Sequence, residues 1–191
     1  MQISYLVTMD QALNYLSSQG LNVPSNINYE NNIKIFRAAA HRKIRNYLGY
    51  EFIDTTYTDE IYSSSGGYFL YLNNRPITSL DAIKLDNVAQ TKTDYIIVDE
   101  THLYFEDMFT KGYNNYKISY KAGWTQANMP GDIRLAALQL IALYNGQTGG
   151  GGTVIGKSSV SNGQGVTESI NPEAEKEILE SLSGYLRYDR I

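Results

Sequence analysis

The sequence predicts an α+β protein that is mainly helical: a small helical bundle with an inserted antiparallel β region and a long glycine-rich loop before the C-terminal helix. Three observations predict this. Apolar residues recur at helical spacing towards both ends of the chain, short β-type runs fill the middle, and glycines gather between the last two helical segments. The chain of 191 residues is long enough for one full domain or for a core with a sizeable insertion.

Two helices are expected before residue 50. Thr8 and Gln11 have the form of a capping box, and Gly20 supplies a stop, so the first helix lies between them. The second helix covers roughly residues 29–48, because its apolar residues recur at three- and four-residue spacing. Gly49 follows where a left-handed cap is needed.

The middle of the chain, residues 51–124, is expected to form a small antiparallel sheet or meander. Short runs rich in β-branched and aromatic residues alternate there with turn residues. The expected strands are residues 68–72, 82–85, 95–98, 103–105 and 116–120, and the expected turns include residues 73–76 and 111–115.

A helix with almost no polar face follows. Pro130 and Asp132 suit its first turn, and from Ile133 to Tyr144 only Arg134 and Gln139 are polar. A helix that is apolar nearly all round must be buried on nearly all sides. It is shorter than the about 20 residues that a membrane span needs. Its sides must therefore be covered by the chain's own elements or by other subunits.

The glycine-rich segment and the last helix complete the chain. The segment cannot bury enough apolar surface to fold alone, so we expect it to stay flexible until a partner holds it. Asn171, Pro172 and Glu173 form a good helix start. The expected organisation is 1–50 for the N-terminal helices, 51–124 for the β region, 125–147 for the central helix, 148–170 for the flexible loop and 171–191 for the C-terminal helix.

The amino-acid composition limits the classes of function that the chain can have. Lys and Arg number 16 against 20 Asp and Glu, and this net charge of -4 argues against a dedicated nucleic-acid binder. The chain has 0 Cys, which excludes disulfides and thiolate metal sites. No signal peptide or run of membrane length is recognised, so we expect a protein made in the cytoplasm. The 17 Tyr against 5 Phe suit either protein–protein interfaces or β-strands, with equal weight.

The chain contains a match to the phosphate-binding pattern G-x-x-x-x-G-K-[ST] at residues 151–158. In a nucleotide-binding protein that loop joins a buried strand to a helix. Here a helix precedes it, a segment without helical periodicity follows, and no apolar strand ending in Asp supplies the metal-binding partner. A chance match in a Gly- and Ser-rich segment is the favoured interpretation, and no nucleotide cofactor is expected.

Other catalytic patterns are scarcer. Asp99, Glu100 and His102 could be imagined as metal ligands, but a polar turn between two strands is favoured because metal sites need ligands that converge from several elements. No Ser–His–acid order and no HExxH pattern occurs. The sequence therefore predicts no enzyme, no catalytic residue, no metal and no cofactor.

The second helix is locally basic. Arg37, Arg42, Lys43 and Arg45 could contact DNA phosphates or an acidic neighbouring subunit. A solvated face opposite the apolar stripe is the favoured interpretation. These four residues remain the best candidates for any DNA contact.

Several segments together resemble a known family. They are IRNYLGY (44–50), RPITSLDAIKLDN (75–87), YIIVDE (95–100), SYKAGWTQANMPGDIRLAALQLIALY (119–144) and IGKSSVSNGQGVTESI (155–170). The most specific feature is a strand that ends in Ala-Gly-aromatic and leads through a Pro-Asp pair into an Ala/Leu-rich helix. In these segments the chain resembles the head–tail connector (adaptor, or head-completion) proteins of long-tailed bacteriophages.

The resemblance implies a structural virion protein of the head–tail neck. Such a protein forms a ring, commonly of twelve copies, beneath the portal of the filled capsid and has no catalytic activity. It extends the channel through which double-stranded DNA passes without sequence-specific binding, and it presents a surface to the next tail-side protein. The implied partners are thus other copies of the chain, the portal, a tail-completion protein and DNA, with no membrane.

The candidate contact residues for subunits or partners are mostly apolar. They are Ile133, Leu140, Ile141, Tyr144, Val154, Ile155, Val160, Val166, Ile178, Leu182, Tyr185 and Leu186. Two alternative functions remain open: a nucleotide-binding protein that uses the phosphate-loop match, and a receptor- or ligand-binding virion protein that uses the Tyr-rich β region.

Overall fold

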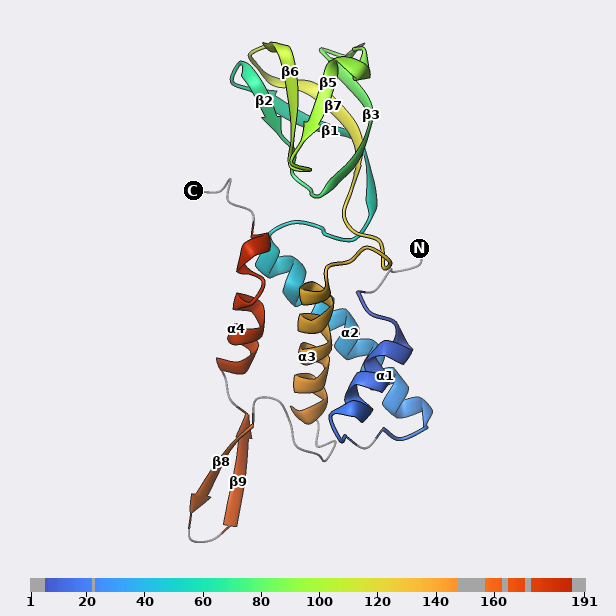
Figure 1. Cartoon of the computed structure of the whole chain (residues 1–191), viewed down its shortest axis with the longest axis vertical. Helices are drawn as coiled ribbons and strands as arrows, with labels where there is room; N and C mark the ends of the chain where they lie inside the picture. Colours follow the sequence, from blue (N-terminus) through green and yellow to red (C-terminus); the bar gives the residue numbers. More distant parts are fainter. Residues whose placement is uncertain (1–5, 22, 148–156, 163–164, 171–172, 187–191) are drawn as a thin grey trace. The chain divides into compact units, whose positions relative to one another are not determined.

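The computed structural model describes residues 6–21, 23–147, 157–162, 165–170 and 173–186 (Figure 1). Contacts within the chain divide it into two compact units. We call residues 1–49 with 129–191 the helical unit, and residues 50–128 the β unit. The β unit is thus inserted between the second and third helices of the helical unit.

The helical unit contains α1 (Met9–Ser18), α2 (Ile27–Leu48), α3 (Gly131–Gln147) and α4 (Glu173–Glu180), followed by a short 3-10 helix, η2 (Ser183–Tyr185). The predicted capping box is confirmed: Thr8 Oγ1 accepts from the Gln11 amide, and the Gln11 side chain accepts from the Thr8 amide. The predicted end of α2 is confirmed as well, since Gly49 has a φ of 82°. Helix α3 packs against α1, α2 and α4 (Figure 1).

The β unit consists of two antiparallel sheets. Their strands are β1 (Thr55–Ser64), β2 (Gly67–Tyr71), β3 (Ile77–Leu85), β4 (Val88–Ala89), β5 (Tyr95–Val98), β6 (His102–Phe109) and β7 (Gly112–Ala122), with the short 3-10 helix η1 (Lys92–Asp94) before β5. One sheet has four strands in the order β1-β7-β3-β4, and the other has three in the order β2-β6-β5.

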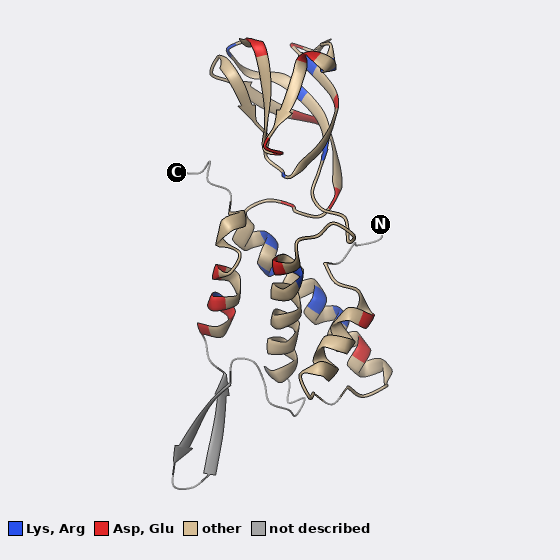
Figure 2. Ribbon diagram, viewed as in Figure 1, with Lys and Arg blue, Asp and Glu red and all other residues tan. Residues whose placement is uncertain are grey.

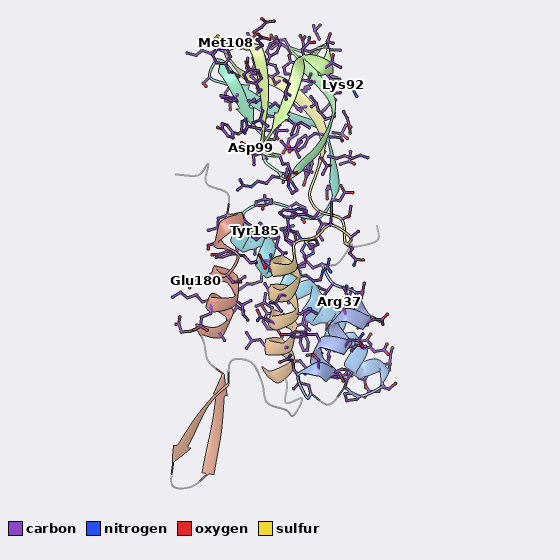
Figure 3. The ribbon with its side chains drawn as sticks, viewed as in Figure 1. Arg37, Lys92, Asp99, Met108, Glu180 and Tyr185 are labelled. Atoms are coloured by element: carbon purple, nitrogen blue, oxygen red, sulfur yellow. The ribbon has the colours of Figure 1, made fainter. Side chains whose placement is uncertain are left out.

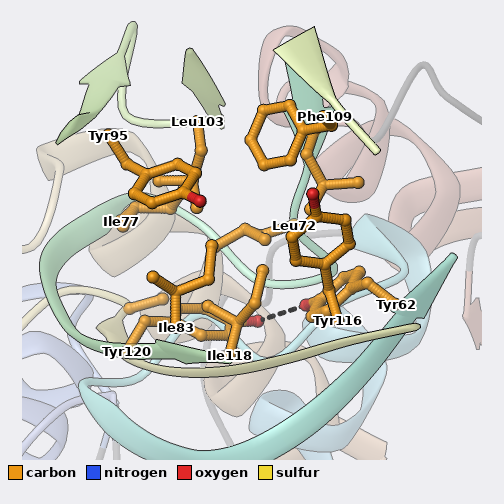
Figure 4. Packing of buried hydrophobic residues seen from close by; sticks show 12 residues of the cluster. Tyr62, Leu72, Ile77, Ile83, Tyr95, Leu103, Phe109, Tyr116, Ile118 and Tyr120 are labelled. Atoms are coloured by element: carbon orange, nitrogen blue, oxygen red, sulfur yellow. Dashed lines mark hydrogen bonds between the residues drawn. The ribbon is translucent and has the colours of Figure 1, made fainter. Parts of the chain in front are cut away.

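A single apolar cluster joins the two sheets of the β unit. Tyr116, Ile118 and Tyr120 of β7 meet Leu103 and Phe109 of β6 in this cluster, as Figure 4 shows. Each of these side chains is almost fully buried. The inner faces of both sheets are therefore packed, and their other faces point outward.

The prediction of a mainly helical protein is wrong. Strands hold about as many residues as helices, because the β unit alone contributes seven strands. The sequence did not reveal β1, where an irregular register between Tyr57 and Glu60 breaks the alternation that marks a strand. It also placed a turn at residues 111–115, although β7 begins at Gly112 and includes Asn114 with a φ of 52°.

The segment expected to be a flexible loop contains regular structure. Strands β8 (Lys157–Asn162) and β9 (Gly165–Ile170) pair antiparallel, from Lys157 opposite Ile170 to Asn162 opposite Gly165. The physical reason lies in the sequence, because β-branched residues occur on both sides of Gly163-Gln164, and Gly as the first of two central residues favours a hairpin turn.

None of the helices in the described residues is both long and apolar enough to cross a membrane.

Candidate interaction surfaces

The apolar helix α3 is covered inside the subunit. Ile133, Leu140 and Ile141 are at most 1% exposed, and they lie among side chains of the helical unit. This burial explains why the helix has so few polar residues. The subunit alone already covers these three residues. Their role in a contact between subunits therefore stays a prediction.

A polar cluster fixes α4 to the rest of the helical unit. Lys43 Nζ on α2 lies 2.5 Å from Glu175 Oε1 on α4, and Tyr144 on α3 donates to Glu175 Oε2 at 3.1 Å. Burial raises the pKa of Tyr144, and the charge of Glu175 and the hydrogen bond to it raise it further. One carboxylate thus connects three helices, so Lys43 and Tyr144 serve the fold of the subunit.

The remaining candidates near the C-terminus also contribute to the subunit: Ile178 lies on α4, and Leu182, Tyr185 and Leu186 follow it. Ile178 and Leu182 are buried, whereas Tyr185 and Leu186 are half-buried. The Tyr185 hydroxyl donates to Asp132 Oδ2 at the start of α3, at 3.3 Å. The apolar residues predicted as one stripe therefore face their own unit, although α4 ends at Glu180 and carries only the first part of it.

The candidates in the glycine-rich segment divide into two pairs. Val154 and Ile155 lie outside the described residues. Val160 lies on β8 opposite Thr167, and Val166 lies on β9 opposite Ser161. The hairpin thus places both valines on paired strands, and their contact with a partner stays a prediction.

The four basic candidates of α2 have different positions. Arg37, labelled in Figure 3, is half-buried and donates to the Val7 carbonyl from Nε at 3.0 Å and from Nη2 at 2.6 Å. Lys43 pairs with Glu175, as described above. Arg42, Lys43 and Arg45 are all exposed. Arg37 and Lys43 therefore contribute to the helical unit through the contacts described, and Arg42 and Arg45 stay candidates for a contact outside it.

An exposed patch on the three-stranded sheet was not among the candidate sites predicted from the sequence. The register places Phe69, Tyr104 and Ile96 side by side, and in the next row Tyr71, His102 and Val98. The rings are in contact: centroids lie 5.5 Å apart for Phe69 and Tyr104 and 4.8 Å apart for Tyr71 and His102. We call the outward side of β2, β6 and β5, with these six residues, the aromatic face.

The aromatic face is open to solvent within the subunit. Phe69, Tyr71 and Ile96 are 50%, 56% and 57% exposed. The sequence signal was the run of consecutive apolar residues Phe69, Leu70 and Tyr71, which indicates a strand with apolar side chains on both sides. In the structure Leu70 is buried, and Phe69 and Tyr71 are exposed. Such a strand needs cover on its second side, and none of the described residues is placed there as part of the core.

Carboxylates border the aromatic face. Asp99 and Glu100 form the turn between β5 and β6, with φ values of 48° and 56°, and Glu106 follows Tyr104 by two residues on β6. All three are exposed. The strands β5 and β6 and their connection, residues 95–109, contain no Lys or Arg. Figure 2 shows the acidic residues at the ends of these strands.

The outward side of the four-stranded sheet has a different character. The register places Lys121 between Thr56 and Ser79, and it places Lys117 between Ile61 and Lys84. We call this side of β1, β7 and β3, with Thr56, Ile61, Ser79, Lys84, Lys117 and Lys121, the lysine face. Lys84 Nζ lies 3.0 Å from Asp59 Oδ1, and its hydrogen bond to that carboxylate lowers the pKa of Asp59.

The phosphate-loop match and the residues considered as metal ligands are placed as follows. In the phosphate-loop match, Lys157 and Ser158 begin strand β8, whereas a nucleotide-binding loop would lead into a helix there. His102 is buried, and its Nδ1 lies 2.8 Å from Thr101 Oγ1. Among the described residues, no group of three or more His, Asp or Glu side chains is placed to hold a metal ion.

Comparison with solved structures finds the same fold in particle necks. The chain is similar to a chain in the neck of an empty gene transfer agent (GTA) particle computed with C6 symmetry, with a TM-score of 0.56, 12% identity, and coverage of 100% of this chain and 97% of that one. In the neck of a native GTA particle computed with C12 symmetry, the TM-score is 0.52 with the same identity and coverage.

A chain in the virion of the native GTA particle gives a TM-score of 0.56 and 11% identity, covering 92% of this chain and 88% of that one. No curated protein matches by sequence. The model of one family, described as head completion protein, matches residues 6–182 and so spans both units. The chain therefore belongs to the head completion protein family.

Proposed function

We propose that the chain forms a closed ring between the portal of the head and the first protein of the tail. The observation that carries the proposal is the family match, which covers residues 6–182 and leaves neither unit out. The similarity to chains in GTA necks supports it at the level of the fold.

The proposed ring contains twelve copies. Its support is that similar chains occur in necks computed with C12 and C6 symmetry. In a cyclic ring, one surface of each copy meets a different surface of the next, so two unlike surfaces are needed. A ring of this kind leaves a lumen, and in the proposal that lumen continues the channel for double-stranded DNA.

DNA has to pass through such a channel without being held. The net charge of -4 suits this requirement, because tight nonspecific DNA binding relies on many Lys and Arg contacts to phosphate. Arg42 and Arg45 are exposed on α2 and are the residues that would touch DNA if α2 lines the lumen. We assign no catalytic role, and in our proposal the chain works only by binding its neighbours.

Electron microscopy of the purified protein, alone and mixed with portal, tests the proposal. We expect closed rings in at least one of the two samples, and in the mixture we expect rings stacked on the portal. A protein that stays monomeric in both samples would contradict it.

Gold labelling of the chain in intact particles provides a second test. Label at the neck fits a connector, whereas label at the tail tip would favour the alternative of a receptor-binding protein.

A further inference from the structure

The β unit has two unlike outer faces on opposite sides. The inner sides of its two sheets share one core cluster, so the aromatic face and the lysine face point away from each other. Both faces belong to the same compact unit, residues 50–128. Their relative position is therefore fixed by that core.

The aromatic face has the make-up of an interface centre. Its middle consists of adjacent apolar and aromatic side chains, with Phe69 and Ile96 on either side of Tyr104. Charged residues stand only at its border, where Asp99, Glu100 and Glu106 are located. Contiguous exposed apolar patches on soluble proteins mark interaction sites, and aromatic centres with polar rims are typical of them.

The lysine face offers the matching chemistry. Lys117 and Lys121 stand on its central strand, β7, and Ile61 beside them is 52% exposed. The acidic groups on this side are few: Asp59 pairs with Lys84, and Asp81 is bonded to Ser79 Oγ at 3.1 Å. The face therefore presents ammonium groups around exposed apolar surface, and the carboxylates that border the aromatic face are their natural partners.

We propose that, in the ring, the aromatic face of one copy packs on the lysine face of the next copy. This inference rests on the proposed ring function. Two unlike faces on opposite sides of one unit are what a heterologous, ring-closing contact requires. A contact between two aromatic faces would instead bring the carboxylates of both copies together, and like charges placed together cost free energy.

The absence of cysteine from the chain allows a direct cross-linking test. Ile96→Cys on the aromatic face is combined with Ile61→Cys on the lysine face, and the assembled protein is oxidised. We expect a ladder of disulfide-linked oligomers on a denaturing gel, because each copy can be linked to the next in both directions. Each single variant should give no ladder.

A matched control uses a site of similar exposure on the helical unit. Ile27→Cys, at a residue that is 64% exposed, replaces Ile96→Cys in combination with Ile61→Cys. We expect at least ten times less cross-linked product than for the test pair. An equal ladder from both pairs, or dimers from Ile96→Cys alone, would overturn the proposal, since the latter shows two aromatic faces in contact.

Charge reversal tests the electrostatic part. Glu106→Lys should reduce the ladder from the cysteine pair several-fold, and adding Lys121→Glu should restore it. A reduction that Lys121→Glu does not restore would contradict the pairing of these two faces.

Microscopy of the same samples separates this inference from the proposed function. Rings without the expected ladder overturn only the assignment of the two faces. A failure to form rings in any sample, with or without portal, overturns the proposed function itself.

Discussion

Tyr62 and Tyr120 share one carboxylate oxygen in the β unit. Both hydroxyls donate to Glu60 Oε2 at 2.6 Å, and they lie 3.0 Å from each other. Each tyrosine hydroxyl has a single proton and uses it in the hydrogen bond to Glu60. Each hydroxyl oxygen can therefore only accept in its other hydrogen bonds. The Asn73 amide donates to Tyr62 at 3.0 Å, and Asn74 Nδ2 donates to Tyr120 at 3.1 Å. The network thus ties the connection between β2 and β3 to strands β1 and β7.

Because of this network, removing the Tyr120 hydroxyl should lower the stability of the fold. Tyr120→Phe leaves the buried Asn74 Nδ2 without its acceptor and removes one of the two hydroxyls that donate to Glu60 Oε2, so the free energy of unfolding should fall by about 1–3 kcal/mol. Denaturant unfolding at neutral pH measures the change. Tyr57→Phe is the matched control, because the buried Tyr57 hydroxyl has no hydrogen bond of good geometry in the described structure. Its effect should stay within about 0.5 kcal/mol, and equal losses for both variants would contradict the assigned network.

The buried tyrosines also predict a loss of stability at high pH. Burial raises the pKa of Tyr95 to about 12 from its ordinary value of 10.0, with smaller contributions from Tyr116 and Asp94. The folded protein therefore holds this proton more strongly than the unfolded chain does. The resulting stability is fully present below pH 10 and is lost as the pH rises from 10 to about 12. In urea unfolding across this range, Tyr95→Phe should lose stability less steeply than the wild type; identical slopes would refute the assignment.

The helical half of the fold could be predicted because its signals are local. Thr8 with Gln11 specifies a start, and Gly49 with a φ of 82° specifies an end, so each boundary depends on a few neighbouring residues. Burial of α3 followed from its composition alone. The sequence could not separate burial within one subunit from burial between subunits, since both exclude water from the same side chains.

The β unit was harder because its signals depend on distant partners. Strand β1 is held by its pairing with β7, for example Tyr57 with Tyr120, and the bulge at Asp59 hides its alternation. The aromatic face was missed for the same reason. Phe69, Tyr104 and Ile96 come from three strands, and only the register brings them together. Likewise, the ion pair of Lys43 with Glu175 joins residues that no local pattern connects.

Two leucines on α3 should respond very differently to a charge. Leu140 is fully buried, whereas Leu135 on the same helix is 47% exposed. Leu140→Asp would place an unpaired charge in the core of the helical unit, so it should lower the free energy of unfolding by several kcal/mol or prevent folding. Leu135→Asp should change it by less than about 1 kcal/mol. Circular dichroism during thermal unfolding checks both, and a Leu140→Asp variant as stable as Leu135→Asp would contradict the burial of this helix.

Charge reversal should have different effects at different basic residues of α2. Reversal of Arg42 and Arg45 to Glu should leave the fold intact, because both side chains are exposed. If α2 lines the channel, assembled heads that contain this variant should retain DNA with a changed dependence on salt. Lys43→Glu should instead weaken the attachment of α4, because it places two carboxylates together at Glu175. DNA retention that is unchanged at every ionic strength would indicate that Arg42 and Arg45 lie on a solvated face and do not contact DNA.

The segment before the last helix is predicted to order on attachment to the portal or to an adjacent copy. Within the described part of the chain, strands β8 and β9 pair only with each other, and a two-stranded ribbon alone is marginally stable in water. Ordering flexible residues costs about 1–2 kcal/mol each, so contacts with a partner have to offset that cost. The free edges of β8 and β9 can supply these contacts by adding to another chain's sheet, and the β-branched Val160 and Val166 suit that arrangement.

Deletion of residues 149–169 should therefore leave both units folded, as judged by their unfolding transitions, while abolishing stable attachment to portal. Hydrogen exchange gives the direct comparison: residues 157–170 should exchange rapidly in the free subunit and slowly in the assembled neck, and equally rapid exchange in both would refute the prediction.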